Sequence, residues 1–185
     1  MIKYILITIL LFLAVGCTQN ETNPKTGTEP VDTAATPDTE LQEATIYLYK
    51  KERITTEINA LRIMKFDNID SMMAYTLDID LIDSTGKVTT QIVGDSGVIR
   101  EAAGVLRIFG NVLVETENGL KLETDYLWWD SNTDRIKSDD FVKITRVETG
   151  DVMSGWGLDS DKDLSTIKIL DRVSGSINDL DNVGN

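Results

Sequence analysis

The chain has 185 residues, of which 41% are hydrophobic and 6% aromatic, which is enough for one compact domain with its own core. Its net charge is -13 at pH 7, and the acidic residues are spread along the whole sequence. This argues against nucleic acid as a partner, because phosphate binding needs a basic surface. The chain contains no histidine, which excludes Ser-His and Cys-His catalytic pairs and the commonest zinc ligands.

The N-terminus has the features of a secretory signal. Lys3 precedes an almost unbroken apolar run over 4–15, which at about 12 residues is too short to cross a bilayer. The run ends in Leu13–Cys17, which resembles a bacterial lipobox, where the cysteine is lipidated and becomes the mature N-terminus. We therefore expect a lipoprotein signal peptide over 1–16 and lipidation at Cys17. The alternative is an ordinary signal peptide with an incidental cysteine.

Residues 17–43 are predicted to form the lipidated N-terminus and a flexible linker. From Thr18 onward this segment is rich in Thr, Pro, Glu, Asp and Asn, and it contains all three prolines of the chain. It has almost no large apolar side chains, so it cannot bury enough surface to fold. Behaving as a coil of about 26 residues, it would span roughly 25 to 30 Å. That length can hold a folded domain clear of a membrane surface.

The predicted domain covers 44–178 and is followed by a flexible tail over 179–185. Its beginning, 44–54, is compatible with a short helix, but β-branched and aromatic residues favour strands here. Apolar and polar residues alternate over 73–82, as in a half-buried strand. Short strands between glycines are then expected at 88–93, 98–100 and 105–109. The pattern predicts an all-β sandwich, jelly roll or barrel.

A tight hairpin is predicted around Asn118 and Gly119. A two-residue turn would mix charged and apolar side chains on each face of the hairpin. A three-residue turn with Gly119 in the left-handed conformation instead pairs Val114 with Leu122 on one apolar face. We therefore predict the three-residue turn, with Gly119 as its structural requirement.

The apolar pattern changes parity within the next strand. Leu122 occupies an even position and Leu127 an odd one, which predicts a β-bulge or corner at Thr124–Tyr126. Comparable breaks are expected at Gly94–Gly97 and at Gly155–Gly157.

These breaks mark an internal repeat of about 30 residues. The aligned positions are Ile92 with Leu122 and Met153, Gly94 with Thr124 and Gly155, Leu106 with Ile136 and Ile167, and Val112 with Val142 and Val173. A strand, a corner and a second strand cannot bury an apolar face alone, so such units would stack around a continuous interior. Coincidental spacing of β-turns is the alternative explanation.

Carboxylates offer the remaining candidates for chemistry. Asp125 and Asp130 flank aromatic residues, as acids do in sugar sites, but nothing in their spacing sets the separation that two catalytic carboxylates need. Asp159–Asp163 opens like a calcium loop, yet Leu164 and Leu170 stand where an EF-hand has glycine and glutamate. We predict no catalytic residue, metal or cofactor, hence no enzyme. A secreted carbohydrate enzyme is the least favoured alternative.

Four motifs follow the anchor and the tether in order: Gly110–Val112, Asn118–Asp130, Asp134–Asp139 and Ser154–Asp161. Together they resemble the LptC family, the periplasmic components of the lipopolysaccharide export ABC transporter in Gram-negative envelopes. The resemblance implies a twisted, open, OstA-like β-jellyroll whose interior holds lipid A acyl chains. It also implies end-to-end pairing of jellyrolls into a bridge. The implied partners are lipopolysaccharide, the transporter's membrane subunits and a periplasmic bridge protein.

Many members of that family carry a transmembrane helix, whereas Cys17 favours a lipid anchor at the periplasmic face of the inner membrane. The candidate lipid-binding residues are Leu77, Ile79, Leu81, Ile92, Leu106, Ile108, Val112, Val114, Leu122 and Ile144. The alternative is an envelope assembly lipoprotein whose closed β core binds only protein partners. In that case the same residues are ordinary core.

Overall fold

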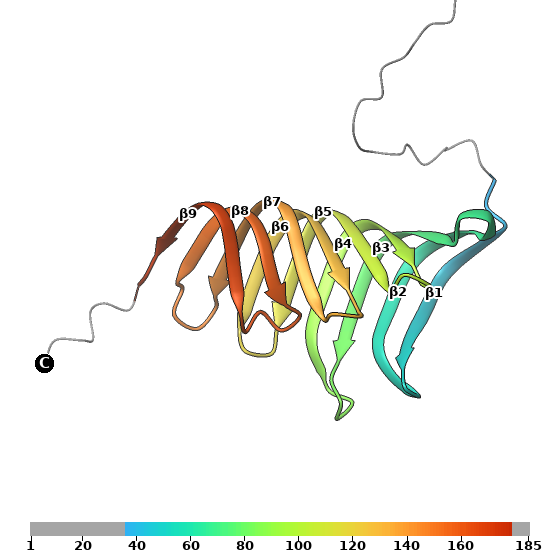
Figure 1. Ribbon diagram of the computed structural model, residues 1–185, viewed down its shortest axis with the longest axis horizontal. Helices are drawn as coiled ribbons and strands as arrows, with labels where there is room; N and C mark the ends of the chain where they lie inside the picture. The colour runs from blue at the N-terminus through green and yellow to red at the C-terminus, as the bar shows by residue number, and fades with distance from the viewer. Residues whose placement is uncertain (1–35, 179–185) are drawn as a thin grey trace, which may run out of the picture. The chain divides into compact units, whose positions relative to one another are not determined.

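The computed structural model describes residues 36–178, which form one sheet of nine antiparallel strands, each paired with its neighbours in sequence (Figure 1). The strands are β1 (Thr39–Lys50), β2 (Arg53–Phe66), β3 (Ser71–Ile82), β4 (Val88–Arg100), β5 (Val105–Thr116), β6 (Leu120–Asp130), β7 (Arg135–Arg146), β8 (Val152–Asp161) and β9 (Ile167–Ser176). One 3-10 turn, η1 (Asp67–Ile69), separates β2 from β3. The predicted all-β class and open β-jellyroll are confirmed. Over these residues no helix has the length and apolarity to cross a membrane.

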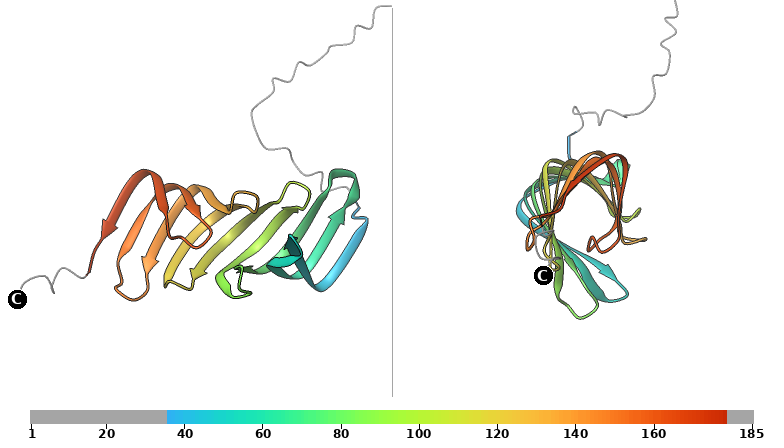
Figure 2. Two further views of the ribbon diagram at one scale, coloured as in Figure 1. Left: turned by 60° about the horizontal axis from the view of Figure 1, so that its bottom comes forward. Right: turned by 90° about the vertical axis from the view of Figure 1, so that its left-hand side faces the viewer.

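A line of β-bulges folds the sheet over on itself. The register shifts between Val93 and Ser96 in β4, and corresponding shifts occur in β5, β6, β7 and β8. Because these bulges lie side by side across β4 to β8, this part of the sheet bends along one line and curves around an interior (Figure 2). Thr124 donates a hydrogen bond of 2.9 Å to the carbonyl of Phe141, a residue that has no partner in the β6–β7 register because of the bulge. The predicted corners at Thr124–Tyr126, Gly94–Gly97 and Gly155–Gly157 are confirmed.

The separate short strands predicted at 88–93, 98–100 and 105–109 are wrong. The first two are parts of β4, and the third is the beginning of β5, so Gly94 and Gly97 lie within a strand. These glycines leave room for neighbouring side chains. A Cβ on Gly97 would lie 2.6 Å from the Leu77 side chain, and one on Gly94 would collide with Ile108. These glycines admit neighbouring side chains where the sheet bends and do not end the strand.

The sheet begins at Thr39, inside the segment that composition marks as linker. Leu41 of β1 pairs with Ile63 of β2, so this polar stretch is an edge strand held by its backbone ladder. The first residues of this edge strand are exposed, so their apolar and polar side chains do not alternate. The sequence therefore does not reveal that the sheet begins at Thr39.

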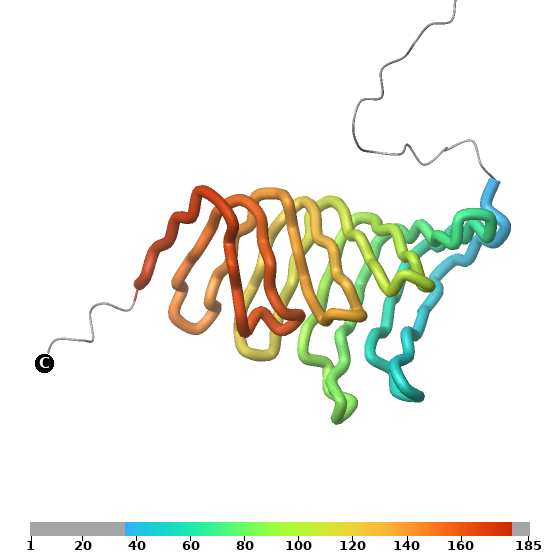
Figure 3. Tube along the Cα trace, in the orientation of Figure 1, coloured from blue at the N-terminus to red at the C-terminus, as the bar shows by residue number. Residues whose placement is uncertain are grey.

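The hairpin and the repeat follow the sequence prediction. Val114 pairs with Leu122 in the predicted register, and Gly119 has φ of 75°, the left-handed conformation that the turn requires. The repeat positions fall in common rows across the strands, and Figure 3 shows the back-and-forth course of the chain that stacks these strands side by side. One row runs Ile92, Val114, Leu122, Ile144 and Met153.

Candidate functional site

The ten residues predicted to bind lipid lie on one face, the inner face of the folded sheet. Each is at most 3% exposed. They come from strands β3 to β7 and join a larger cluster that also contains Ile58, Ile63, Ile99, Leu127, Trp129 and Ile136. Sequence reasoning did not include these six. Ile58 could have been found, because Thr56, Ile58 and Ala60 alternate with the polar Glu57 and Asn59 in β2.

The inner face is filled by its own side chains. Ile46, Ile58, Ile79 and Ile92 form one cross-strand row, and all but Ile46 are fully buried. Cross-strand neighbours on one face of a sheet lie in van der Waals contact, so the middle of the interior is a packed core. Space for a ligand is therefore found where the interior reaches its edges.

One opening lies at the β9 end of the sheet. A cavity of about 430 Å³ is lined there by apolar residues that include Leu120, Ile144, Met153 and Ile177. Met153 is 42% exposed although its partner Ile144 is buried, because its partner on the other side is Gly175 of β9, which has no side chain to cover it, and β9 is the last strand of the described sheet. The inner face is thus accessible from this end.

The two rims of the folded sheet meet along a seam. Successive turns of a meander alternate between opposite edges, so one rim carries the β1–β2, β3–β4, β5–β6 and β7–β8 turns and the other rim carries the remaining four. Thr90 Oγ1 donates to the Lys162 carbonyl at 2.9 Å, and Asn118 Nδ2 donates to the Asp163 carbonyl at 3.1 Å. Within residues 36–178, the seam is therefore closed by hydrogen bonds from side chains to the β8–β9 turn, without a backbone ladder.

The β8–β9 turn also inserts a side chain into the interior. Leu164 is only 1% exposed and belongs to the core cluster, although it has φ of 54°. That left-handed conformation costs a leucine about 1–2 kcal/mol, and burial of its side chain, at about 1.5–3 kcal/mol, offsets the cost. In the sequence this residue was visible only as a mismatch to a calcium loop.

The Asp161 carboxylate organises the same turn. It accepts hydrogen bonds from the backbone N–H groups of Ser165 at 2.7 Å and Thr166 at 3.1 Å. Burial raises the pKa of Asp161, but the hydrogen bonds from Ser165 and Thr166 outweigh it and hold the pKa below its ordinary value. The acidic run that begins like a calcium loop is thus a hydrogen-bonded turn.

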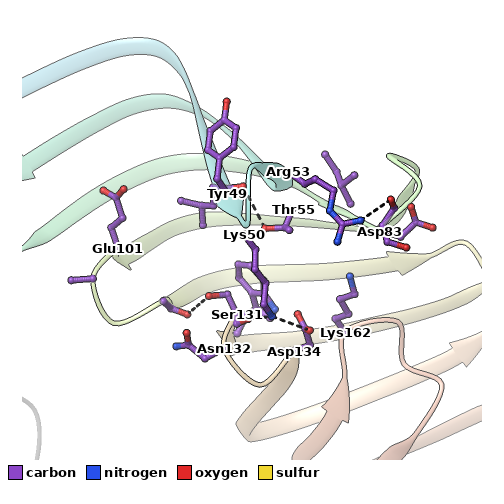
Figure 4. Close-up of a pocket in the computed structure, with 16 residues that line it drawn as sticks. Tyr49, Lys50, Arg53, Thr55, Asp83, Glu101, Ser131, Asn132, Asp134 and Lys162 are labelled. Carbon is purple, nitrogen blue, oxygen red and sulfur yellow. Dashed lines mark hydrogen bonds and ion pairs between the residues drawn. The ribbon is translucent and has the colours of Figure 1, made fainter.

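A second opening, which we name the mouth, lies along the seam between the β1–β2 turn and the β4–β5 and β6–β7 turns. Its cavity measures about 490 Å³, and Figure 4 shows Lys50, Arg53 and Lys162 entering it from the two rims. Lys50 Nζ donates to the Ser131 carbonyl at 3.4 Å and lies 3.7 Å from the Asp134 carboxylate. The mouth is therefore bounded by charged groups.

The floor of the mouth is apolar. Leu48 and Trp129 line it, and both also line an adjoining cavity of about 300 Å³ that reaches Ile99 and Leu106. Trp129 is 3% exposed, and its Nε1 donor has no hydrogen-bond partner within residues 36–178. The mouth thus connects a charged rim to the inner face.

The acids considered for catalysis do not form a pair. Asp125 is exposed at the bulge of β6, whereas Asp130 ends that strand and accepts a hydrogen bond of 2.9 Å from the Asn132 backbone N–H. Asp130 lies five positions after Asp125, a distance of about 16 Å along extended strand, beyond the reach of paired glycosidase carboxylates. Among residues 36–178, no three His, Cys, Asp or Glu side chains are grouped so that they could hold a metal ion.

Comparison with solved structures places this fold beside a known transport protein. The crystal structure of LptH, described as the LptA homologous periplasmic component of the conserved lipopolysaccharide transport device from Pseudomonas aeruginosa, is similar with a TM-score of 0.53. The two chains share 11% sequence identity over 66% of this chain and 94% of that chain. At this identity the likeness shows the fold alone.

The family comparison covers nearly the whole chain. A search among curated proteins gives no match. The family model for lipopolysaccharide assembly, LptC-related, matches residues 5–178, which contain the complete sheet and both openings. The chain therefore belongs to the LptC family, whose members are non-enzymatic periplasmic components of lipopolysaccharide transport.

Proposed function

We propose that this protein accepts lipopolysaccharide from the export ABC transporter and passes it along a bridge of β-jellyrolls. The observation that carries the proposal is the continuous apolar inner face, which runs through seven cross-strand pairings from Ile46 to Met153 and opens at the β9 end. Such a face suits acyl chains. Transfer of one chain from water contributes on the order of 10 kcal/mol, at about 0.8 kcal/mol for each methylene.

The packed interior must widen to hold a lipid, and the seam allows this. The rims are joined by a few hydrogen bonds between turns, so separating them leaves all eight strand pairings intact. The ten inner-face residues predicted from the sequence are the proposed contacts of the acyl chains. An acyl chain that enters replaces contacts between side chains with contacts to methylenes, which are equally apolar.

Free strand edges supply the proposed contacts with neighbours. Within the described sheet, β1 and β9 each pair on one side only, and such edges recruit further strands by β-augmentation. We assign the β9 edge to the next jellyroll of the bridge, because the cavity beside it would join the two interiors. The membrane subunits of the transporter are the proposed partners at the other end.

The proposed anchor is a lipid on Cys17 at the periplasmic face of the inner membrane. Cys17, the expected signal peptide over 1–16 and the expected tail over 179–185 lie outside the described residues. The short apolar run and its lipobox-like end support the anchor. A tether from there to β1 would keep the sheet clear of the bilayer.

Depletion of the protein from cells tests this function. We expect newly made lipopolysaccharide to accumulate in the inner membrane and to disappear from the cell surface, measured by pulse-labelling and membrane fractionation. The tagged protein should also co-purify with the transporter. Normal arrival of lipopolysaccharide at the surface after depletion would overturn the proposal.

The alternative is an envelope assembly lipoprotein that binds only proteins. The complete burial of residues such as Ile79 and Ile92 favours it, because a filled core needs no ligand. Under this alternative, depletion would disturb an envelope protein complex while lipopolysaccharide export continued.

A further inference from the structure

The mouth combines charged side chains at its rim with an apolar floor. It collects Lys50, Arg53 and Lys162 at one cavity in a chain whose net charge is -13. We propose that the mouth binds the phosphate-bearing head of an acylated glycolipid while its acyl chains extend past Trp129 to the inner face. The identification of this lipid as lipopolysaccharide rests on the proposed function.

The cations of the mouth are available to an anion. Arg53 and Lys162 form no ion pair with any residue that the structure describes, and Arg53 uses one nitrogen, Nη1, to donate to the Ser84 carbonyl at 3.1 Å. The remaining guanidinium donors form a planar fork that matches phosphate oxygens. The Lys162 main chain is held by Thr90, which fixes the point from which its side chain projects.

Three carboxylates also border the mouth, and two of them are already held by protein donors. Asp83 accepts hydrogen bonds from the Thr85 backbone and hydroxyl, both at 2.7 Å, and Asp134 is paired with Lys50. Glu101 is the third. The charges on the rim balance, so an anion would bind by local contacts with Arg53 and Lys162 and not by a general positive field.

The floor beneath these cations suits the rest of an amphiphile. The mouth and the adjoining cavity run from the charged rim past Leu48 to Leu106, which is one of the proposed acyl-chain contacts. Trp129 Nε1 is a buried donor without an acceptor among the described residues, an arrangement that is rare and costly in proteins. An ester or phosphate oxygen of a lipid in the mouth would supply the missing acceptor.

The test compares two lipids that differ only in their phosphates. The purified full-length chain is titrated in one detergent with fluorescent bis-phosphorylated lipid A and with the same lipid after removal of both phosphates. The wild type is expected to bind the phosphorylated lipid about tenfold more tightly, the effect of about one charge-assisted contact. That preference should decrease as salt is added.

Variants assign the preference to the mouth. In the double variant Arg53→Gln, Lys162→Gln the preference should disappear, while binding of the dephosphorylated lipid stays unchanged and thereby reports an intact interior. Lys51→Gln is the matched control, because this lysine lies in the same β1–β2 turn but does not line the cavity. It should retain the preference.

The contrary outcomes are distinct. Equal binding of the two lipids by the wild type, or a preference that survives in the double variant, would overturn the head-group site and leave the proposed transport function standing. Failure of the wild type to bind either lipid would overturn both.

Discussion

The hydroxyl of Thr90 donates a 2.9 Å hydrogen bond to the carbonyl of Lys162, although Thr90 lies in β4 and Lys162 follows β8, four strands further along the sheet. This contact joins the two rims directly. The line of bulges thus bends the sheet, and contacts along the seam on the opposite side hold its two rims together. A sheet built in this way can open at the seam without losing strand pairing, which is the property that a lipid carrier needs.

Leu164 is expected to stabilise the closed seam. Leu164→Ala should lower the free energy of unfolding by roughly 2–5 kcal/mol, because the side chain fills the interior from the β8–β9 turn. Leu170→Ala is the control at an exposed leucine of the neighbouring strand and should cost less than about 1 kcal/mol. Urea denaturation measures both. A cost for Leu164→Ala no larger than that of the control would contradict the inserted position of this turn.

Gly94 is expected to be needed for stability, because the Ile108 side chain occupies the space that a Cβ would take. Gly94→Ala should lower the free energy of unfolding by about 1–3 kcal/mol, because the new Cβ would collide with Ile108 Cγ2. Gly175→Ala, whose Cβ would meet nothing nearer than 3.3 Å, is the milder control. In a background of Ile108→Ala, the added cost of Gly94→Ala should shrink. Thermal unfolding of these variants completes the comparison, and an undiminished cost would show that the collision is not the cause.

The Asp83 carboxylate in the β3–β4 turn is expected to make the free energy of unfolding depend on pH in acid. Hydrogen bonds from Thr85 and Lys87 lower its pKa from 3.8 to about 2. A carboxylate with a lowered folded pKa contributes stability above pH 3.8, and this contribution is lost as pH falls toward about 2. We expect Asp83→Asn to flatten the pH dependence of unfolding in that window, measured by urea denaturation at a series of pH values. Parallel curves for the variant and the wild type would argue against this role.

The anchor prediction concerns the covalent state of Cys17. Mass spectrometry of the mature protein should find a diacylglyceryl group on this cysteine as the first residue. The variant Cys17→Ala should carry none, because no thiol remains to accept the lipid. A mature N-terminus that begins elsewhere or carries an unmodified cysteine would contradict the lipid anchor and favour an ordinary signal peptide.

The parts of this structure that follow from local pattern could be predicted from the sequence. The pairing of Val114 with Leu122 and the bulge after Thr124 follow from period-two alternation and its change of parity. Leu164 could not be found in this way, because its partners are far away in sequence and its turn is polar. The uninterrupted run of β4 through Gly94 was missed for a similar reason. The space that this glycine provides is used by Ile108 of the next strand.

The candidate site divides in the same way. Ten inner-face residues could be predicted because each lies in a segment of alternating or repeating apolar positions, whereas six further members of the same cluster, among them Ile63 and Leu127, were missed. The mouth brings together Lys50, Arg53 and Lys162, and nothing in the sequence relates the β1–β2 turn to the β8–β9 turn. Sites formed across the seam depend on how far the sheet folds, which is a property of the whole sheet and not of any one segment.

Photo-crosslinking in cells at Met153 tests the central claim most directly, that the inner face carries the lipid. Met153 lies on the inner face at the β9 opening and is 42% exposed, so a benzophenone amino acid fits there without disturbing the packed core. Ser154, the next residue of β8, points to the outer face and is the control. We predict that irradiation links lipopolysaccharide to position 153 and not to position 154. Capture of proteins alone at 153, or equal capture of the lipid at both positions, would contradict the claim.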